Sequence, residues 1–329
     1  MKAYVLTGGG IDGIEARSIP EPRPGPGDVL VAVRATSLNF RDASIAERGV
    51  SGRIPLSDAA GEVIAVGEGV IDPVVGDRVA TCFSAQWIDG PITQAAYDSA
   101  LGGAIDGVLA ERVVLPASAV VRMPSGWTYE QAATLPCAAV TAWNALVEGA
   151  LLTPGDHVLL LGTGGVSVFG LQLARLLGLR TIITSSSDVK LERMAQLGAD
   201  VMVNYAATPD WDRRVLEVTG GRGVDRVLEV GGADTLARSL AATRLGGEVT
   251  VIGIVSGEAT LNPRLLVGRS QTLRGVWVGN RRMFTDLVEF VDLHGLEPVI
   301  DATFEFADAV AAYRHLKAQT HVGKVVVRV

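Results

Sequence analysis

Hydrophobic and polar residues follow two different patterns along the 329-residue chain. Up to about residue 122, short β-rich runs such as 29–35 and 109–115 are separated by turns rich in glycine and proline. This first pattern predicts a β-rich part of the protein, arranged as a partly open barrel.

From residue 123 onward, strand-like apolar runs alternate with segments whose apolar residues recur at helical spacing. Six strands are expected, at 158–161, 181–185, 201–204, 224–230, 249–252 and 273–278. Strands that alternate with helices in this way predict an α/β fold with a doubly wound parallel sheet. The chain is then expected to end with helices at 284–294 and 307–318 and a strand at 324–329.

The composition is that of a globular protein, with 48% hydrophobic and 20% charged residues. A net charge of −7 argues against a nucleic acid or an anionic membrane surface as partner, because either would favour a basic patch. No uninterrupted apolar run reaches about 18 residues, so no membrane span is expected. Cys82 and Cys137 are too few for a disulfide framework, and the N-terminus enters a strand without a signal peptide. These features predict a cytoplasmic protein.

A glycine-rich turn follows the first strand of the expected sheet and precedes a helix. The turn comprises Gly162, Thr163, Gly164, Gly165, Val166 and Ser167. Gly162 permits a tight turn, Gly164 lets the backbone approach a pyrophosphate, and the amides that open the helix point at that anion. Ser167 stands where the dinucleotide fingerprint has its third glycine, but it is small enough for close packing of helix on strand. In this context the turn predicts dinucleotide binding.

The end of the second strand indicates which dinucleotide binds. NAD enzymes usually place a carboxylate there for the ribose hydroxyls, whereas this chain has Ser185 and two further serines. Hydroxyls can donate to a 2′-phosphate, Lys190 follows, and Tyr205 adds a phenolic donor just past the third strand. Two alternatives stay open: Lys190 is a solvated helix residue, or Asp188, the nearest acid, is the carboxylate that binds the ribose. We expect Asp188 instead to cap a helix that starts at 189. We predict NADP(H) as the cofactor.

Several motifs occur in a fixed order along almost the whole chain. They are SLNFRD (37–42), DAAGEV (58–63), VGEGV (66–70), GDRV (76–79), LPCAAVTA (135–142), the glycine turn, LGA (197–199) and GKVVV (323–327). In these motifs the chain resembles the medium-chain dehydrogenase/reductase superfamily, and most closely its zinc-independent quinone oxidoreductase branch.

The resemblance implies a particular domain arrangement. A Rossmann NADP-binding domain at 123–283 would be inserted in a β-rich GroES-like catalytic domain made of 1–122 and 284–329. The substrate, a small molecule, would bind in a cleft. Family members are commonly dimers or tetramers, and a homodimer is expected here.

Zinc-containing members of the superfamily hold a catalytic metal with a Cys, a His and a second Cys or acid. The resemblance places Asn39 and Ser57 at the first two of these positions, and only Cys137 falls at a ligand position. Zinc requires three protein ligands, and Cys137 with the neighbouring Asp58 makes a poor cage. No metal site is therefore expected. Without a Lewis acid, a quinone or an α,β-unsaturated carbonyl is a better hydride acceptor, because hydrogen-bond donors can hold its developing oxyanion.

Two polar residues of the SLNFRD motif are candidates for catalysis. Asn39 is expected to donate an amide N–H to the cofactor or to the substrate oxygen; the alternative is that it caps its own loop. Arg41 is expected to stabilise the enolate or quinol anion; the alternative is a salt bridge with Asp42 or Asp58.

Further candidates are spread along the chain. By the resemblance, Thr141 faces the nicotinamide from a helix start; the alternative is an ordinary helix hydroxyl. Tyr97 lies in a variable loop, where it could line the substrate pocket or supply a proton. Lys324 could reach the cofactor or the cleft, or be a surface charge. Four more residues follow the fifth and sixth strands of the sheet and are expected beside the cofactor: Gly253, Ile254, Val278 and Asn280.

These features predict an NADPH-dependent oxidoreductase that transfers hydride to a quinone or an α,β-unsaturated carbonyl without a metal. An alternative within enzymes is a zinc-type alcohol dehydrogenase. An alternative of another class is a non-catalytic NADPH-binding protein that acts as a sensor or has a structural role.

Overall fold

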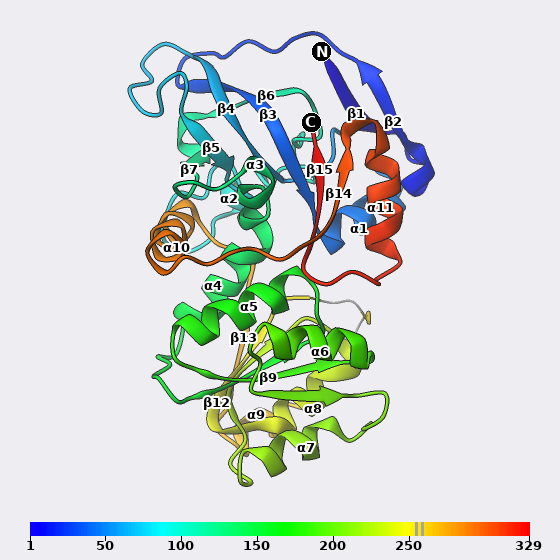
Figure 1. Cartoon of the computed structure of the whole chain (residues 1–329). Helices are drawn as coiled ribbons and strands as arrows, with labels where there is room; N and C mark the ends of the chain where they lie inside the picture. Colours follow the sequence, from blue (N-terminus) through cyan, green and yellow to red (C-terminus); the bar gives the residue numbers. More distant parts are fainter. Residues whose placement is uncertain (254–255, 258–259) are drawn as a thin grey trace. The chain divides into compact units, whose positions relative to one another are not determined.

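The computed structural model describes residues 1–253, 256–257 and 260–329. They form two compact units, one made of Met1–Val140 with Gly279–Val329 and the other made of Thr141–Val278 (Figure 1). The first unit therefore consists of two chain segments, and the second is a continuous insertion between them.

The first unit is built on a seven-stranded sheet in the order β14-β15-β3-β4-β5-β7, in which β6 pairs with the first half of β3. All its pairs are antiparallel except the parallel pair β14–β15. A separate hairpin joins β1 and β2. The strands are β1 Lys2–Leu6, β2 Ile14–Ser18, β3 Asp28–Leu38, β4 Asp58–Val66, β5 Arg78–Thr81, β6 Arg112–Pro116, β7 Val120–Arg122, β14 Ile300–Glu305 and β15 Lys324–Arg328.

Short helices surround this sheet: α1 Phe40–Glu47, α2 Gln94–Tyr97, α3 Tyr129–Ala132, α10 Arg281–His294 and α11 Ala309–Lys317, with 3₁₀ turns at Gly10–Gly13, Ala117–Ala119 and Phe306–Asp308. A π-helical turn, Leu135–Ala139, leads into α4, Val140–Val147. The helix α10 has a capping residue at each of its two ends. Asn280 accepts a hydrogen bond from the Met283 amide at the start, and Gly295 with φ +63° ends the helix.

The second unit contains a six-stranded sheet in the order β10-β9-β8-β11-β12-β13, and every pair in it is parallel. The prediction of an α/β fold with a doubly wound parallel sheet is therefore confirmed. The elements are β8 His157–Leu161, α5 Gly165–Leu176, β9 Arg180–Ser185, α6 Asp188–Gln196, β10 Val201–Asn204, α7 Trp211–Val218, β11 Val224–Glu229, α8 Ala233–Ala242, β12 Thr243–Val251, α9 Arg264–Val267 and β13 Thr272–Gly275.

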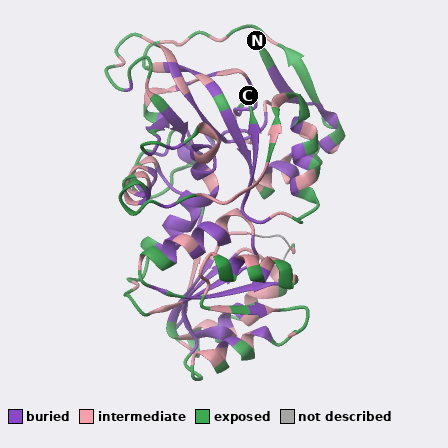
Figure 2. Cartoon of the chain, viewed as in Figure 1, coloured by how far each residue is buried: buried purple, intermediate pink, exposed green. Residues whose placement is uncertain are grey.

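Continuous apolar runs form the central strands of this sheet because helices cover both of its faces. Val158, Leu159 and Leu160 of β8 are fully buried, and so are Val227 and Leu228 of β11. Figure 2 shows the same distribution, with buried residues along the strands of each unit and exposed residues on the outer faces of the helices.

The boundaries of the compact units differ from the domain boundaries expected from the sequence. Residues 123–140 and 279–283 belong to the first unit. The helix α3 packs on β3 and β4, and the π turn packs on β4 and β5, which ties this segment to the first sheet. Helix and strand patterns alone did not reveal that packing.

Three elements also differ from the expected ones. β12 begins at Thr243, six residues before the expected 249, and β13 already ends at Gly275. The strand β14 was not expected. Its residues are half-buried or exposed, so they lack the regular alternation of buried and exposed positions that predicts a strand.

Within the described part of the chain, no helix has both the length and the apolar character needed to span a bilayer.

Candidate functional site

The glycine turn of the second unit joins the carboxyl end of β8 to α5. Gly162 has φ +73°, a conformation that L side chains rarely adopt, and Gly164 is the N-cap of the helix. A Cβ added at either glycine would meet no atom within 4 Å. The space beside these glycines is therefore open, and the first amides of α5, from Gly165 and Val166 onward, have no partner within the helix. This arrangement suits a pyrophosphate.

Two residues of α5 hold this helix against the sheet. Ser167 is buried, and its hydroxyl donates to the carbonyl of Leu161, 2.6 Å away. At Gly170 an added Cβ would lie 3.0 Å from the methyl groups of both Leu160 and Leu228. Gly170 thus allows the close approach for which the fingerprint uses its third glycine. Sequence reasoning missed this residue, although a glycine inside an apolar helix is costly and signals close packing.

Two of the residues expected at a 2′-phosphate, Ser185 and Tyr205, meet at the carboxyl ends of β9 and β10. The amide of Tyr205 donates to the carbonyl of Ser185, 3.0 Å away, and the amide of Gly162 donates to the Thr184 hydroxyl at 3.4 Å. Ser185 is buried, Lys190 is half-buried on the first turn of α6, and Tyr205 is 43% exposed. The second strand thus ends in hydroxyl groups next to the glycine turn.

The expectation that Asp188 caps the following helix was wrong. The helix α6 begins at Asp188 itself, and its N-cap is Ser187, whose hydroxyl accepts from the Lys190 amide at 3.4 Å. The Asp188 carboxylate instead accepts from the side-chain amide of Asn204, 2.7 Å away. Asp188, the acid nearest to the expected 2′-phosphate site, is therefore hydrogen-bonded to the last residue of β10.

The loops after β12 and β13 contain the next expected cofactor residues. Gly253 passes so close to β11 that an added Cβ would lie 2.4 Å from the Val230 carbonyl. Ile254 lies outside the described residues. Val278 has φ +41°, which is strained for a β-branched residue, and its carbonyl accepts from the Asn144 side chain at 2.7 Å. Such strain is concentrated at functional sites, so Val278 stays a candidate.

Asn280 has a structural task in the first unit. Its side-chain oxygen caps α10, and its side-chain nitrogen donates to the Gly90 carbonyl at 3.4 Å. Both ends of its amide are therefore engaged, and a side-chain contact with a cofactor would have to replace one of these bonds.

Asn39 lies at the end of β3 and is the N-cap of α1. Its backbone amide donates to the Asp42 carboxylate, 2.7 Å away. The Asn39 side chain and the Asp42 backbone complete a capping box at the start of α1, so the alternative that Asn39 caps its own loop stays open. The side-chain oxygen accepts from the ammonium of Lys324 at 2.5 Å, and the side-chain nitrogen, although buried, has no hydrogen-bond partner among the described residues.

Arg41 and Asp42 follow on the same helix. The Arg41 guanidinium donates to the Leu101 carbonyl at 3.0 Å and lies 4.5 Å over the centre of the Phe83 ring. Arg41 thus binds a carbonyl and an aromatic ring and acts on Asp42 through its charge. Burial raises the pKa of Asp42 to about 6, an effect that Arg41 opposes.

The remaining catalytic candidates differ widely in exposure. Thr141 is buried in α4 directly after the π turn, and Tyr97 at the end of α2 is 48% exposed. The roles of both in catalysis stay predictions. Lys324 is only 2% exposed, so the alternative of a surface charge was wrong.

The side chains at the zinc-ligand positions do not fit zinc. Asn39 offers an amide, and the Ser57 hydroxyl donates to Asp58 at 2.6 Å. Burial raises the pKa of the Cys137 thiol, and Asp58 adds to the rise. The ammonium of Lys324 lies 3.6 Å from the Asp58 carboxylate. In the described residues, no group of three or more His, Cys, Asp or Glu side chains could hold a metal ion.

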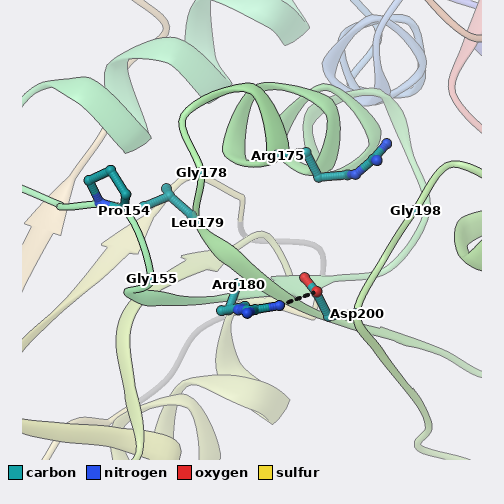
Figure 3. A pocket seen from close by; sticks show the side chains of 8 residues that line it. All are labelled: Pro154, Gly155, Arg175, Gly178, Leu179, Arg180, Gly198 and Asp200. Atoms are coloured by element: carbon teal, nitrogen blue, oxygen red, sulfur yellow. Dashed lines mark hydrogen bonds and ion pairs between the residues drawn. The ribbon is translucent and has the colours of Figure 1, made fainter.

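A hollow of about 530 Å³ lies elsewhere in the second unit, at the amino ends of β8 and β9 (Figure 3). Arg180 pairs there with Asp200 at 3.3 Å, and Arg175 donates to the Leu197 carbonyl at 2.6 Å. The strands are parallel and the glycine turn follows the carboxyl end of β8, so this hollow lies at the other edge of the sheet. Both arginines already have partners, and the hollow is not part of the dinucleotide site.

Comparisons with known proteins match both units. Residues 25–125 match the family model of the alcohol dehydrogenase GroES-like domain, and residues 165–292 match that of the zinc-binding dehydrogenases. Zinc-type alcohol dehydrogenase-like protein C1773.06c of Schizosaccharomyces pombe is 42% identical over 321 residues, which cover 92% of this chain and 91% of that protein.

Two solved structures bear on the cofactor. The structure of an NAD-dependent alcohol dehydrogenase superposes with a TM-score of 0.91 at 32% identity and covers 100% of both chains. The mycobacterial protein Rv1454c complexed with NADPH superposes with a TM-score of 0.83 at 29% identity, again over 100% of both chains.

Proposed function

The chain belongs to the medium-chain dehydrogenase/reductase superfamily, and from this premise we propose that it reduces quinones or α,β-unsaturated carbonyls with NADPH. The observation that carries the proposal is the side chain of Asn39. Its oxygen is held by the buried ammonium of Lys324, and its nitrogen keeps a donor without an acceptor in the described part of the chain. A fixed, unsatisfied N–H group is suited to binding an oxygen on which negative charge develops.

The second unit supplies the proposed cofactor site. The open glycine turn and the first amides of α5 would bind the pyrophosphate, and Ser185, Lys190 and Tyr205 would bind the 2′-phosphate. The NADPH complex of the mycobacterial relative supports this choice, whereas the NAD-dependent relative makes NADH the rival. When bound, the cofactor supplies the hydride.

The first unit supplies the proposed donors for the substrate. Asn39 would donate its free N–H to the carbonyl or quinone oxygen and so stabilise the enolate or quinol anion. Arg41 adds positive charge on the same helix, although its guanidinium is already held by Leu101 and Phe83. A positioned donor and a nearby charge are sufficient for an activated acceptor, and none of these groups needs a metal.

The test is a steady-state assay of the purified protein with NADPH or NADH and a panel of quinones, enones and alcohols. We expect turnover of quinones or enones with NADPH, and transfer of deuterium from C4-deuterated NADPH to the β-carbon of an enone. Asn39→Ala should lower kcat about 100-fold, the usual effect of removing one oxyanion donor, and should leave NADPH affinity unchanged. Asn262→Ala, at an exposed position, is the matched control.

Three outcomes would contradict the proposal. Alcohol oxidation that depends on added zinc would assign a zinc-type alcohol dehydrogenase. Turnover with NADH at equal or better kcat/KM would overturn the cofactor assignment. Tight NADPH binding with no turnover of any acceptor would favour a non-catalytic sensor or structural protein.

A further inference from the structure

Lys324 at the start of β15 is a charged side chain in the interior of the first unit. It is 2% exposed, and Asp58 at the start of β4 is fully buried. The Lys324 ammonium donates to the Leu38 carbonyl at 2.8 Å and to the side-chain oxygen of Asn39, and it lies 3.6 Å from the Asp58 carboxylate. These three oxygens surround the ammonium, so its position is defined by the end of β3 and the start of β4.

The carboxylate that faces Lys324 is itself fixed. One oxygen of Asp58 accepts from the Ser57 hydroxyl at 2.6 Å, and the other accepts from the Cys137 amide of the π turn at 3.2 Å. A buried charge is costly unless it is paired and hydrogen-bonded. Asp58 therefore holds the ammonium at this place, and the ammonium balances the negative charge of the buried Asp58 carboxylate.

The contact with Lys324 determines which way the Asn39 amide points. An ammonium has only donors, so it can bond the amide oxygen and never the amide nitrogen. The nitrogen must then occupy the opposite end of the amide, where it has no partner among the described residues. The backbone of Asn39 is fixed separately, through its amide and the Asp42 carboxylate at 2.7 Å.

We propose that Lys324 is a positioning residue: paired with Asp58, it locks the Asn39 side chain with the N–H donor directed away from the ammonium and unpaired, so that a substrate oxygen can become its acceptor. The proposal rests on the proposed function, because it deepens the part that Asn39 takes in it. Lys324 acts through Asn39 and touches neither the substrate nor the reacting atoms.

The kinetic test is a double-mutant cycle in the full-length protein. Lys324→Met should lower kcat at least about 10-fold, because a misdirected amide forfeits a large part of the effect of an oxyanion donor. NADPH affinity, measured by fluorescence titration, should stay unchanged. The double variant K324M/N39A should be no slower than N39A, and Lys324→Arg should recover part of the activity. Lys317→Met, an exposed lysine that pairs with Glu47, is the matched control.

The cycle has two outcomes that would overturn the proposal. If the effects of K324M and N39A on kcat multiply, Lys324 does not act through Asn39. If K324M weakens NADPH binding and leaves kcat intact, Lys324 is a cofactor ligand. Because K324M leaves Asp58 unpaired and could prevent folding, the neutral pair K324M/D58N is made alongside. It should fold and still show the reduced kcat; full activity of a folded K324M/D58N would equally refute the proposal.

A second measurement separates this proposal from the proposed function. The chain has five asparagines, so selective ¹⁵N-asparagine labelling gives five side-chain amide signals, and N39A identifies that of Asn39. K324M should shift the Asn39 signal alone, and Lys324→Arg should restore it. These changes of the Asn39 signal are expected even if the wild-type protein reduces no quinone or enone. An Asn39 signal that K324M leaves in place would refute the positioning role.

Discussion

At the scale of single residues, long-range partners decided what several side chains do. From the sequence, Asn39 could be a residue that caps its own loop. In the structure its side-chain oxygen also accepts a hydrogen bond from Lys324, which lies 285 positions later. Asp188 looked like a cap and instead bonds to Asn204, while Ser187 caps α6. Asn, Asp and Ser compete for the same local bonds, so their choice follows from whichever acceptor or donor the fold brings close.

Lys190 should determine the cofactor preference. We expect Lys190→Ala to raise the KM for NADPH about 10- to 100-fold, since a hydrogen bond to a charged group is worth about 1.5–3 kcal/mol. The KM for NADH should change little, because NADH has no 2′-phosphate. The measurement compares kcat/KM for both cofactors, with Lys317→Ala as control. Equal losses for NADPH and NADH would show that Lys190 does not contact the 2′-phosphate.

Asp42 should make stability depend on pH. Burial raises the pKa of its carboxyl to about 6 from 3.8, so the folded protein holds this proton more tightly than the unfolded chain does. Its contribution to stability is therefore complete below pH 3.8 and is lost as the pH rises through about 6. Asp42→Asn should gain stability relative to wild type across this window, by about 3 kcal/mol at most.

The measurement is urea unfolding of wild type and Asp42→Asn between pH 4 and pH 7. Only the change with pH of the difference between the two proteins is compared, because other carboxyl groups affect both proteins equally. Asp286→Asn, at an exposed position of α10, is the control. A difference in the free energy of unfolding that stays constant over this pH range would show that Asp42 keeps an ordinary pKa.

At the scale of elements, the helix α5 combines two glycines with opposite tasks. At Gly164 an added Cβ meets nothing within 4 Å, whereas at Gly170 it meets two leucine methyl groups at 3.0 Å. The first glycine leaves room for a ligand, and the second leaves room for the sheet. Sequence alone assigned the binding task to Gly164 and overlooked the packing task of Gly170.

Substitutions at these two glycines should separate binding from stability. Gly164→Asp places a favourable N-cap residue and a negative charge where the pyrophosphate would bind. We expect unchanged stability and at least about 10-fold weaker NADPH binding, since 1.4 kcal/mol of repulsion gives this factor. Gly170→Val should lower the free energy of unfolding by about 1–3 kcal/mol through overpacking.

Urea unfolding and NADPH titration of both variants check this prediction, and each variant is the control for the other. Normal NADPH affinity in a folded Gly164→Asp would exclude the turn as the pyrophosphate site. Unchanged stability of Gly170→Val would show that α5 does not pack as closely as described.

Another element, the helix α4, is anchored by a buried arginine. Arg226 of β11 is fully buried and donates to the carbonyls of Ala145 and Leu146 at 2.9 and 2.8 Å, in the last turn of that helix. Helix ends leave carbonyl groups without partners, and the guanidinium satisfies them inside the core. Thr141, the candidate beside the nicotinamide, lies on a helix that is fixed in this way.

At the scale of the whole molecule, the side chains at the positions where zinc-containing members of the superfamily hold their metal predict a protein without catalytic zinc. We expect less than stoichiometric zinc in the purified protein and no loss of NADPH-dependent activity after dialysis against a chelator. Plasma emission spectroscopy and the enone assay check this expectation, and a zinc-containing alcohol dehydrogenase treated in the same way is the control. One zinc per chain, with activity lost on its removal, would refute it.

The sequence by itself determined the element types and the order of the second unit, because buried parallel strands are continuous apolar runs and the glycine turn needs special backbone conformations. It also singled out Ser185, Lys190 and Tyr205 as candidates for the 2′-phosphate, and this role stays a prediction. It located the unit boundaries less well, because the packing of 123–140 on β3 and β4 leaves no periodic pattern.

Only the tertiary structure decided which polar side chains meet in the first unit. Asn39, Asp58 and Lys324 come from three strand ends that are far apart in the sequence, and Lys324 read on its own was open to being a surface charge. The burial of that ammonium against Asp58, and with it the direction of the Asn39 amide, follows from the pairing of β15 with β3 and of β3 with β4. Strand pairing is a long-range choice set by the packing of the whole sheet, so no local pattern in the chain encodes it.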